Sequence, residues 1–264
     1  MNKISAYIIA FNEERKIADA IQSVKWADEI VVIDSNSKDR TAEIATSLGA
    51  KVVQVEFNGF GKLRTSAVEA CSHEWIFSLD SDERCTSDVA HEIQSIVAHS
   101  MVDVCFIPRR NFFLGREIKY SGWYPNYRQP QLFRRGSMEY DESPVHERYQ
   151  IKTNSKVHYL KHAIWQLPFN DLAESIHKMN RYSSLGASKS RQKGSSFSKA
   201  LGHSIWAFIR HYVFKRGFLD GWAGFVIAFA YSEVTFYRYA KAVELAHQEA
   251  WEARWQEIQK TNPR

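Results

Sequence analysis

Two aspartates that flank one serine, Asp80-Ser81-Asp82, form the part of this sequence best suited to chemistry. They follow the run from Glu74 to Leu79, which predicts a buried strand whose end presents both carboxylates to one space. Carboxylate oxygens suit Mg²⁺ or Mn²⁺, and these ions often share their coordination with phosphate oxygens. A plain turn after a strand would use the same residue types. We favour a divalent metal that holds a phosphate compound.

Two further predicted strands also end in acidic segments. The run from Lys3 to Ala10 leads into Phe11-Asn12-Glu13-Glu14, and the run from Glu29 to Asp34 leads into a polar segment that ends at Asp39. Ligands of open parallel sheets bind at the carboxyl ends of the strands. Like charges gathered there repel one another unless a cation or a hydrogen-bond donor lies between them. The three strand ends together therefore predict a metal–nucleotide site.

A glycine-bearing loop adds positive charge to this prediction. The loop Gly59-Phe60-Gly61-Lys62-Leu63-Arg64 enters a helix predicted over 62–70, where Lys62 or Arg64 could meet a diphosphate. A solvated lysine in an ordinary loop is the alternative. The sequence has neither G-x-G-x-x-G after its first strand nor G-x-x-x-x-G-K-[ST], which disfavours a dinucleotide site and a P-loop.

Alternating strands and helices must position these residues. The predicted strands span 3–10, 29–34, 51–55, 74–79 and 104–108, and the first, second and fourth intervening helices are predicted to be capped by Asn12, Asp39 and Ser87. This alternation predicts a parallel sheet covered on both faces. The segment 109–159 is irregular, with strand-like pieces at 131–133 and 157–160. From Asp171 onward the pattern is helical, with a Gly/Ser/Lys-rich break over 183–198.

Positive charge is concentrated in the segment 175–219, which contains no acidic residue. Its nine basic residues exceed the net charge of +5, so the other residues together carry −4. They are Lys178, Arg181, Lys189, Arg191, Lys193, Lys199, Arg210, Lys215 and Arg216. A solvated helical face would explain such a segment. Attraction to an anionic surface is the sharper hypothesis.

The pattern inside this segment favours a membrane over nucleic acid. A helix with one apolar face is predicted from the spacing of Leu201, Ile205, Phe208, Ile209, Tyr212 and Val213. A basic amphipathic helix with aromatic residues is typical of an interfacial anchor, although a core-packed helix would show the same period. The residues predicted to meet the membrane are Lys199, Trp206, Arg210, Lys215 and Arg216.

Three classes of protein are disfavoured by composition. The three cysteines form no C-x-x-C pair, which excludes a disulfide scaffold or a zinc finger and indicates a reducing compartment. The apolar run near the start spans only Ala6 to Phe11, so we expect no signal peptide. No window reaches the roughly 18 uncharged apolar residues of a spanning helix. We therefore expect a cytoplasmic location.

The motifs, in this order, resemble those of family 2 glycosyltransferases of the GT-A fold. They are I-I-A-F-N-E-E at 8–14, V-V-I-D-S-N-S-K-D-R-T at 31–41, the G-x-x-R loop at 61–64 and F-S-L-D-S-D-E at 77–83. The resemblance extends from the start of the chain to about Trp165. Two motifs depart from the family: the usual Pro-x-Tyr-Asn reads Ala10-Phe11-Asn12, and the usual D-D-G-S reads D-S-N-S from Asp34, without its second acid.

Later motifs resemble the branch that builds the inner core of lipopolysaccharide, whose members add a glucose, often to heptose. They are Gly122-Trp123-Tyr124-Pro125, Gln131-Leu132-Phe133-Arg134-Arg135, Val145-His146-Glu147 and Phe218-x-Asp220-Gly221-x-x-Gly224. The substrate assignment rests on this resemblance alone.

The resemblance implies a role for each matching residue. Phe11 and Asn12 would flank the nucleotide base with Glu14 nearby, and Asp34 would accept a hydrogen bond from the base. Arg64 would contact base or phosphate, Asp80 the ribose or metal, and Asp82 the metal, while His146 could reach the metal or the diphosphate. The metal, Mg²⁺ or Mn²⁺, would offset the charge of the departing diphosphate.

An inverting transfer also needs a carboxylate that takes the proton of the acceptor hydroxyl. The candidates are Asp141, Glu142 and Glu147, and we favour Glu147 because it adjoins His146. Trp123, Tyr124 and Arg134 are candidates for the acceptor wall. Trp123 is favoured, because sugars stack on aromatic faces, and burial in the core is the alternative.

Together these observations predict an α/β protein of the GT-A fold, with a mostly parallel sheet flanked by helices over 1–170 and a helical, basic, membrane-associating tail over 171–264. The hypothesis is an inverting glycosyltransferase that moves a hexose, with glucose favoured, from a nucleotide-sugar, with UDP-glucose favoured. The acceptor would be a lipid-linked lipopolysaccharide core, with heptose favoured, at the cytoplasmic face of the inner membrane.

Two rival functions stay open on the residues alone. A metal-dependent phosphohydrolase could use Asp80 as its nucleophile, but Arg84 stands where that class has Thr or Val. A non-enzymatic membrane-surface binding module is the second rival, and three aligned acidic strand ends count against it.

Overall fold

The computed structural model describes residues 2–99, 102–123, 127, 129–141, 149–192 and 194–261. The chain divides into two compact units. Unit 1 comprises Met1–Phe112 and Pro125–Pro168, and unit 2 comprises Phe113–Tyr124 and Phe169–Arg264. The segment Phe113–Tyr124, which chain order assigns to the first predicted domain, therefore belongs with the C-terminal helices.

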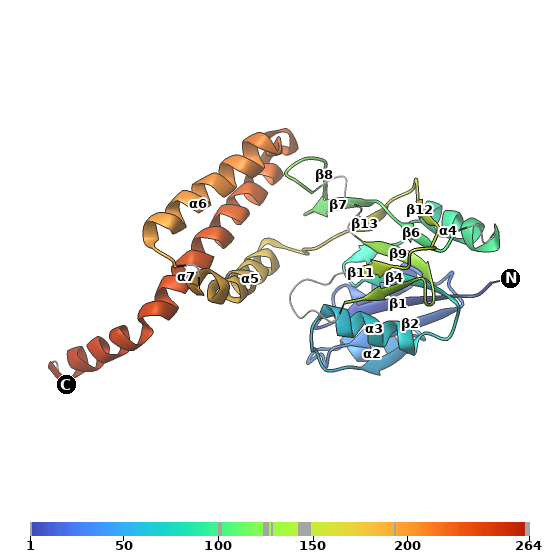
Figure 1. Cartoon of the computed structure of the whole chain (residues 1–264), viewed down its shortest axis with the longest axis horizontal. Coiled ribbons are helices and arrows are strands. Elements are labelled where there is room, and N and C mark those ends of the chain that lie inside the picture. The colour runs from blue at the N-terminus through green and yellow to red at the C-terminus, as the bar shows by residue number, and fades with distance from the viewer. Residues whose placement is uncertain are drawn as a thin grey trace. The chain divides into compact units, whose positions relative to one another are not determined.

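Unit 1 is built on a seven-stranded sheet with the order β12-β6-β9-β4-β1-β2-β3 (Figure 1). The strands are β1 (Ile4–Ala10), β2 (Glu29–Asp34), β3 (Lys51–Gln54), β4 (Trp75–Asp80), β6 (Val104–Phe106), β9 (Pro130–Arg134) and β12 (Val157–Tyr159). Strand β9 runs antiparallel to β4 and β6, and the other neighbouring pairs are parallel. The prediction of a mostly parallel α/β sheet is confirmed.

Both faces of this sheet are covered. The side chains of β1 alternate between two core clusters: residues 4, 6, 8 and 10 join one, and residues 7 and 9 join the other. The first cluster also holds residues of α1 (Ile17–Ser23), α2 (Thr41–Ser47) and α4 (Ser87–His99). The second holds residues of α3 (Phe60–Ala70) and of the hairpin β10 (Met138–Tyr140) and β11 (Tyr149–Ile151). Burial on both faces explains why β1 is apolar at every position except Ser5.

A smaller sheet in unit 1 follows the D-S-D segment. Strand β13 (Ile164–Gln166) pairs antiparallel with β5 (Glu83–Arg84) and parallel with β7 (Arg109–Phe113). The sequence predicts no strand at β5, β7 or β13, because such short pieces carry too little period to be recognised. These pairings bring residues 83 and 109 into one layer of unit 1.

Two of the predicted helix caps are wrong. Asn12 has a left-handed backbone (φ 55°), and α1 starts later, after Lys16. The cap of α4 is provided by Thr86, whose Oγ1 accepts from the amide of Val89 at 3.3 Å, and not by Ser87. Asp39 does serve the start of α2, because its Oδ1 accepts from the Thr41 amide at 3.0 Å.

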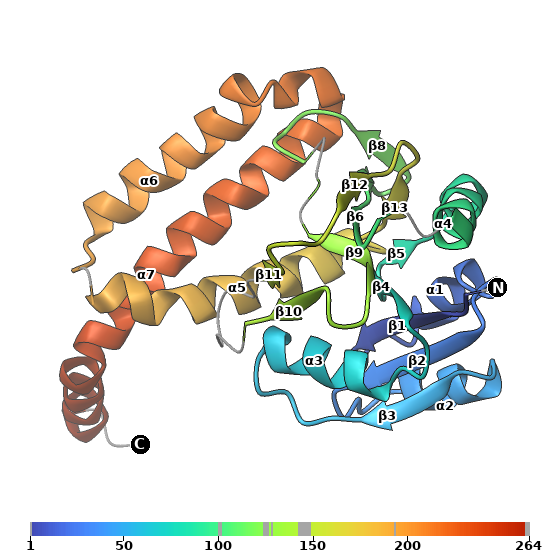
Figure 2. The same cartoon turned by 45° about the vertical axis from the view of Figure 1, so that its right-hand side comes forward.

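Unit 2 is helical. It contains β8 (Arg116–Ile118), α5 (Leu172–Gln192), α6 (Phe197–Ile209), the π-turn η1 (Arg210–Phe214), the 3₁₀ turn η2 (Gly217–Asp220) and the long α7 (Gly221–Thr261). Helices α5 and α6 both pack against α7 (Figure 2). The break predicted over 183–198 is wrong for most of its length, because α5 continues to Gln192. Its buried Ser183, Ala187 and Ser190 are small enough to allow close helix packing.

The outward face of α6 carries several of its large apolar side chains. Its buried residues are the small Ala200 and Ser204, and the Ser204 carbonyl accepts from Ser232 Oγ of α7 at 2.9 Å. Leu201, Ile205 and Val213 of the predicted apolar stripe are exposed, whereas Phe208 and Tyr212 are half-buried and contact the Phe225 ring of α7. No helix in the described part of the chain combines the length and apolar character needed to cross a bilayer.

The start of α7 lies in unusually close contact with η2. A Cβ atom at Gly224 would lie 1.8 Å from the carbonyl oxygen of Gly217, and one at Gly217 would lie 2.7 Å from that of His211. Because backbone atoms cannot move aside as a flexible side chain can, both positions require glycine. The second glycine in the motif Gly221-x-x-Gly224 is thus explained by packing.

We predict that Gly224→Ala destabilises the protein by about 3 kcal/mol, because the added methyl group forces α7 away from η2. Gly202→Ala in α6 is the matched control, since a Cβ there would meet no atom within 4 Å. The control is expected to stabilise α6 by about 0.5–1 kcal/mol through helix propensity. Urea unfolding followed by circular dichroism measures both, and equal effects would contradict the packing argument.

Candidate active site

The carboxyl ends of three neighbouring strands carry the acidic residues predicted from the sequence. In the sheet, Ile9 of β1 pairs with Asp80 of β4, and Ala10 pairs with Asp34 of β2. Adjacent strands lie about 4.8 Å apart, which puts the backbones of Asp34 and Asp80 about 10 Å apart. Phe11 and Asn12 follow β1 between them. The structure thus brings these residues to one edge of the sheet.

Hydrogen bonds join the loops after β1 and β2. The amide of Asn12 donates to Ser37 Oγ at 2.8 Å, and Asn12 Oδ1 accepts from the Lys38 amide at 2.7 Å. The buried Asp34 accepts from the amide of Ser37 at 3.0 Å and from the Ser37 hydroxyl. The amide of Glu14 donates to Asp39 Oδ2 at 3.1 Å. Asp34 therefore shapes the loop, while the exposed Phe11 ring faces solvent beside it.

The buried guanidinium of Arg64 is directed at Asp80. Its Nη2 donates to Asp80 Oδ1 at 2.8 Å and its Nη1 to Ser78 Oγ at 3.0 Å, and it lies 5.9 Å from the centre of the Tyr140 ring. Only 2% of the Arg64 side chain is exposed. Arg64 can therefore act on a ligand through Asp80, whereas Lys62, one residue after Gly61 in the first turn of α3, is exposed.

A completely buried carboxylate, Glu83, holds the D-S-D turn in place. Its Oε2 accepts from the Asp80 amide at 3.0 Å and from Gln131 Nε2 at 3.0 Å. Its Oε1 lies 2.5 Å from Nε of the equally buried Arg109. Burial raises the pKa of Glu83 to about 7, and the Arg109 guanidinium opposes that rise. These contacts fix the backbone from which Asp80 and Asp82 project.

Sequence reasoning missed Glu83, Arg109 and Gln131 as parts of the site. A charged residue in β5 and a glutamine inside the apolar strand β9 are the signals that could have found them, because a buried polar group needs a partner. The two terminal nitrogens of Arg109 have no hydrogen-bond partner among the described residues. Water is a natural partner for such buried donors.

A divalent cation would be held by few protein ligands here. Among the described residues, no group of three His, Cys, Asp or Glu side chains could hold a metal. Asp82 is partly exposed, and its carboxylate accepts no hydrogen bond from a described residue, whereas Asp80 is paired with Arg64. This donor set fits Mg²⁺ or Mn²⁺ that takes one or two carboxylates and completes its shell with phosphate oxygens and water.

The structure does not bring all predicted site residues together. Arg134 pairs in register with Trp75 at the beginning of β4, the opposite edge of the sheet from Asp80. The length of β4 separates those ends by about 17 Å, so a place for Arg134 beside the strand-end carboxylates does not fit. Its guanidinium lies 5.2 Å from the centre of the Trp75 ring instead.

The other acceptor and base candidates have different outcomes. Trp123 belongs to unit 2, where it is partly buried and its Nε1 donates to Tyr231 Oη at 3.2 Å. Asp141 is exposed, one residue past the end of β10. Tyr124, Glu142, His146 and Glu147 lie outside the described residues.

The chain belongs to glycosyl transferase family 2, because the model of that family matches residues 5–158. An uncharacterized glycosyltransferase of Rickettsia bellii is 30% identical, with 93% of this chain and 88% of the relative covered. The lipopolysaccharide core biosynthesis glycosyltransferase LpsC of Rhizobium meliloti is 28% identical, with 90% and 93% covered. The protein is thus a glycosyltransferase with a relative in lipopolysaccharide core synthesis.

Solved structures agree on the fold. The crystal structure of S. aureus TarS 1-349 in complex with UDP superposes with a TM-score of 0.50 at 15% identity, and 88% of this chain and 90% of that chain are covered. The GT-A fold is thereby confirmed. Membership of an enzyme family also removes the support for a non-enzymatic binding module.

We predict that Glu83→Gln destabilises the protein by about 3 kcal/mol, because it leaves the Arg109 cation buried without its counter-charge. Glu43→Gln is the matched control: it breaks the Arg40–Glu43 pair, whose side chains are 68% and 64% exposed. Exposed pairs contribute little, so the control should leave the urea midpoint unchanged. Equal midpoints for wild type and Glu83→Gln would contradict the role given to Glu83.

Proposed function

We propose that this glycosyltransferase moves a hexose, with glucose favoured, from a nucleotide-sugar to a lipid-linked lipopolysaccharide core with inversion at the anomeric carbon. The observation that carries the proposal is the edge formed by Asp34, Asp80 and Asp82, where the partly exposed Asp82 follows the Arg64-bound Asp80. The name of the LpsC relative supports the acceptor class, and the choice of heptose rests on the sequence resemblance.

The chain's own residues would divide the work on the donor. The exposed ring of Phe11 offers an apolar surface for a base, and Asp80, held by Arg64, offers an acceptor oriented for ribose hydroxyls. Asp82 would hold Mg²⁺ or Mn²⁺, which supplies the positive charge that offsets the diphosphate as it departs. Lys62 would add a cation near the amino end of α3.

The acceptor hydroxyl needs a base in this scheme. Asp141, Glu142 and Glu147 stay the candidates, and Glu147 remains favoured. A carboxylate that takes the hydroxyl proton while the oxygen attacks the anomeric carbon from the side opposite the diphosphate gives inversion. A phosphohydrolase that uses Asp80 as nucleophile is less compatible with the structure, because Asp80 Oδ1 is already bound to Arg64.

We predict that Asp82→Asn lowers glycosyl transfer at least 100-fold, because an amide cannot replace the charge that a divalent ion needs. Thermal shift with UDP, tested with and without Mn²⁺, is the binding measurement. We expect wild type to be stabilised by UDP only with Mn²⁺, and Asp82→Asn to lose that stabilisation. UDP is chosen because the TarS structure is a complex with UDP.

Asp88→Asn is the control for the loss of one negative charge, because Asp88 is exposed in the first turn of α4. It should keep both transfer and the Mn²⁺-dependent shift. If Asp82→Asn behaved like this control, the metal–nucleotide assignment would be wrong. A panel of nucleotide-sugars tested in the same way would identify the donor.

We further propose that unit 2 is a peripheral contact with an anionic membrane. Large apolar side chains are exposed around the turn between α6 and α7, among them Leu201, Ile205, Trp206, Val213, Phe214 and Phe218. The exposed cations Lys199, Arg210, Lys215 and Arg216 lie in the same stretch of chain, which has no acidic residue before Asp220.

The exposure of these apolar residues favours a membrane over the alternative of a core-packed helix. Trp206 is 53% exposed and Phe214 is 66% exposed, and their rings lie 5.5 Å apart. A solvated face would not need aromatic residues, whereas an interfacial surface combines them with cations. Such a contact would bring a protein without a membrane-spanning helix in its described part to a lipid-linked acceptor.

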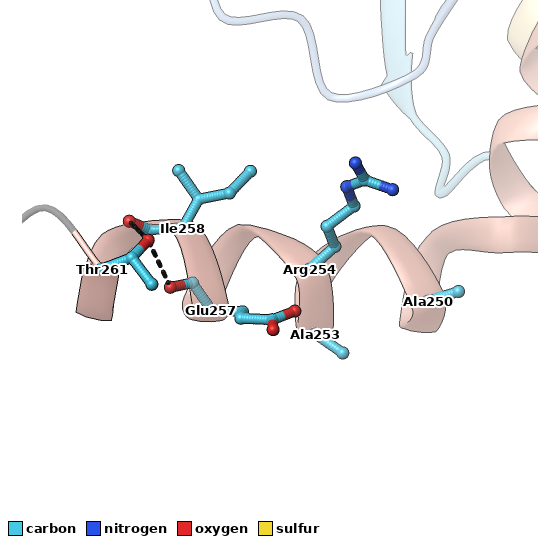
Figure 3. A pocket seen from close by; sticks show the side chains of 6 residues that line it. All are labelled: Ala250, Ala253, Arg254, Glu257, Ile258 and Thr261. Carbon is cyan, nitrogen blue, oxygen red and sulfur yellow. Dashed lines mark hydrogen bonds between the residues drawn. The ribbon is translucent and has the colours of Figure 1, made fainter.

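The far end of α7 offers a matched control surface. Trp251 is 52% exposed and Trp255 is 60% exposed, which resembles the exposure of Trp206 and Phe214. Their neighbours carry both signs of charge, as Arg254 and Glu257 in Figure 3 illustrate. Two exposed aromatic residues can thus be removed with or without a basic surrounding.

We predict that Trp206→Ser with Phe214→Ser weakens binding to vesicles of equimolar phosphatidylglycerol and phosphatidylcholine at least tenfold, because two interfacial anchors are lost. Trp251→Ser with Trp255→Ser should bind like wild type. Sedimentation with these vesicles at low and high salt measures both the apolar and the charge contribution. Equal binding by the two double variants would refute this contact surface.

A further inference from the structure

The carboxylate of Asp220 accepts hydrogen bonds from a segment in the middle of the chain. Asp220 is buried, and its Oδ1 accepts from the Lys119 amide at 3.1 Å. Its Oδ2 accepts from the Tyr120 amide at 3.1 Å and from Ser121 Oγ at 2.7 Å. Asp220 forms no ion pair with any described residue, so these donors alone stabilise the buried charge.

Further contacts of the same segment with η1 and α7 reach as far as Trp123. The Ser121 amide donates to the Lys215 carbonyl at 3.0 Å, and His211 Nδ1 donates to the Ser121 carbonyl at 2.9 Å. The His211 ring stacks on Tyr231 with 3.7 Å between centroids, and Tyr231 Oη accepts from Trp123 Nε1. Burial lowers the pKa of the His211 imidazole below its usual value.

Close backbone packing allows Asp220 to reach these hydrogen-bond donors. Gly217 precedes Asp220 in η2, and a Cβ there would also lie 3.0 Å from Ser121 Oγ. Gly221 follows Asp220 with φ +65°, a conformation that side chains rarely adopt. The motif around Asp220 therefore builds one set of hydrogen-bond acceptors for the segment 119–121.

In the chain, this segment comes shortly before a strand of the candidate active site. Residues 119–123 lie between β7 and β9 in sequence, and β9 pairs with β4, the strand that ends at Asp80. The segment also leads into Trp123 and Tyr124, the acceptor candidates, while Lys215 and Arg216 belong to the membrane surface proposed above.

We propose that Asp220 is a positioning residue for the lipid-linked acceptor. It holds residues 119–123 on the turn that carries the membrane-contact residues. The aromatic segment that would bind the acceptor then lies next to the surface that would meet the lipid. The inference rests on the proposed function, and it assigns Asp220 to recognition of the acceptor, with no part in binding of the donor.

The test compares wild type with Asp220→Ala in the binding of three probes. The first is UDP with Mn²⁺, the second is the vesicles of equimolar phosphatidylglycerol and phosphatidylcholine, and the third is the same vesicles with heptose-terminated lipopolysaccharide added. We expect wild type to bind the third at least tenfold more tightly than the second. Asp220→Ala should reduce that preference to less than twofold, while its binding of UDP and of plain vesicles stays within twofold of wild type.

Two variants separate positioning from folding. Asp220→Asn keeps one accepting oxygen and the side-chain shape, so an intermediate preference of about threefold to fivefold is expected. Asp171→Ala removes another carboxylate of unit 2, whose Oδ1 accepts from the Glu174 amide at 2.8 Å, and should keep the full preference. Hydrogen exchange of the amides of Lys119 and Tyr120 should accelerate in Asp220→Ala and not in Asp171→Ala.

The outcomes distinguish this inference from the proposed function. If wild type prefers the lipopolysaccharide vesicles and both Asp220 variants keep that preference, the inference alone is overturned. If Asp220→Ala loses UDP binding to the same extent as acceptor binding, Asp220 is structural and the positioning role is overturned. If wild type binds UDP with Mn²⁺ but shows no preference between the vesicles, the proposed acceptor and the inference fall together.

Discussion

The pairing of the buried Glu83 carboxylate with its donors is the interaction on which the proposed catalytic edge of unit 1 depends. A charge without access to water must be compensated by hydrogen-bond donors and an opposite charge, and here the donors come from three separate parts of the chain. The Asp80 amide, Gln131 and Arg109 converge on it. Because this single requirement fixes the turn that bears Asp80 and Asp82, the proposed metal–nucleotide site inherits its shape from a residue whose own oxygens are already engaged by protein donors.

Unit 2 uses the same physical device at a different place. Asp220, like Glu83, is a buried carboxylate held by several donors. Glu83 accepts from the nearby Asp80 amide and from the side chain of Gln131, whereas Asp220 accepts from the amides of Lys119 and Tyr120 in a distant segment. In each case a loop that local sequence leaves undetermined is held by an acceptor too costly to leave unpaired. The two carboxylates would support different steps of substrate binding. Glu83 supports the site proposed for the donor, and Asp220 supports the segment proposed for the acceptor.

The charge distribution follows the same division of labour. Outside the basic segment the chain is net negative, and several of its carboxylates gather at the strand ends, where a cation and a diphosphate would balance them. The basic segment forms helices whose buried residues are small and whose exposed residues include Leu201, Ile205 and Trp206. The proposed reaction, which joins a nucleotide-sugar donor to a lipid-linked acceptor, would use both kinds of surface. The net charge of +5 describes neither part of the chain.

The amino-acid sequence alone was enough to predict the strands β1 to β4 and the position of Asp34, Asp80 and Asp82 at strand ends. The spacing of apolar residues and the polarity of strand ends are local properties. They can therefore be predicted without knowing which segments pack against them. The packing of distant parts of the chain places Arg64 against Asp80, puts Arg134 at the opposite edge, and leaves Leu201 and Ile205 of α6 exposed. The same holds for the partners of Glu83 and Asp220. These features depend on which residues far apart in the chain pack together, and a period of two or 3.6 residues carries no information about that choice.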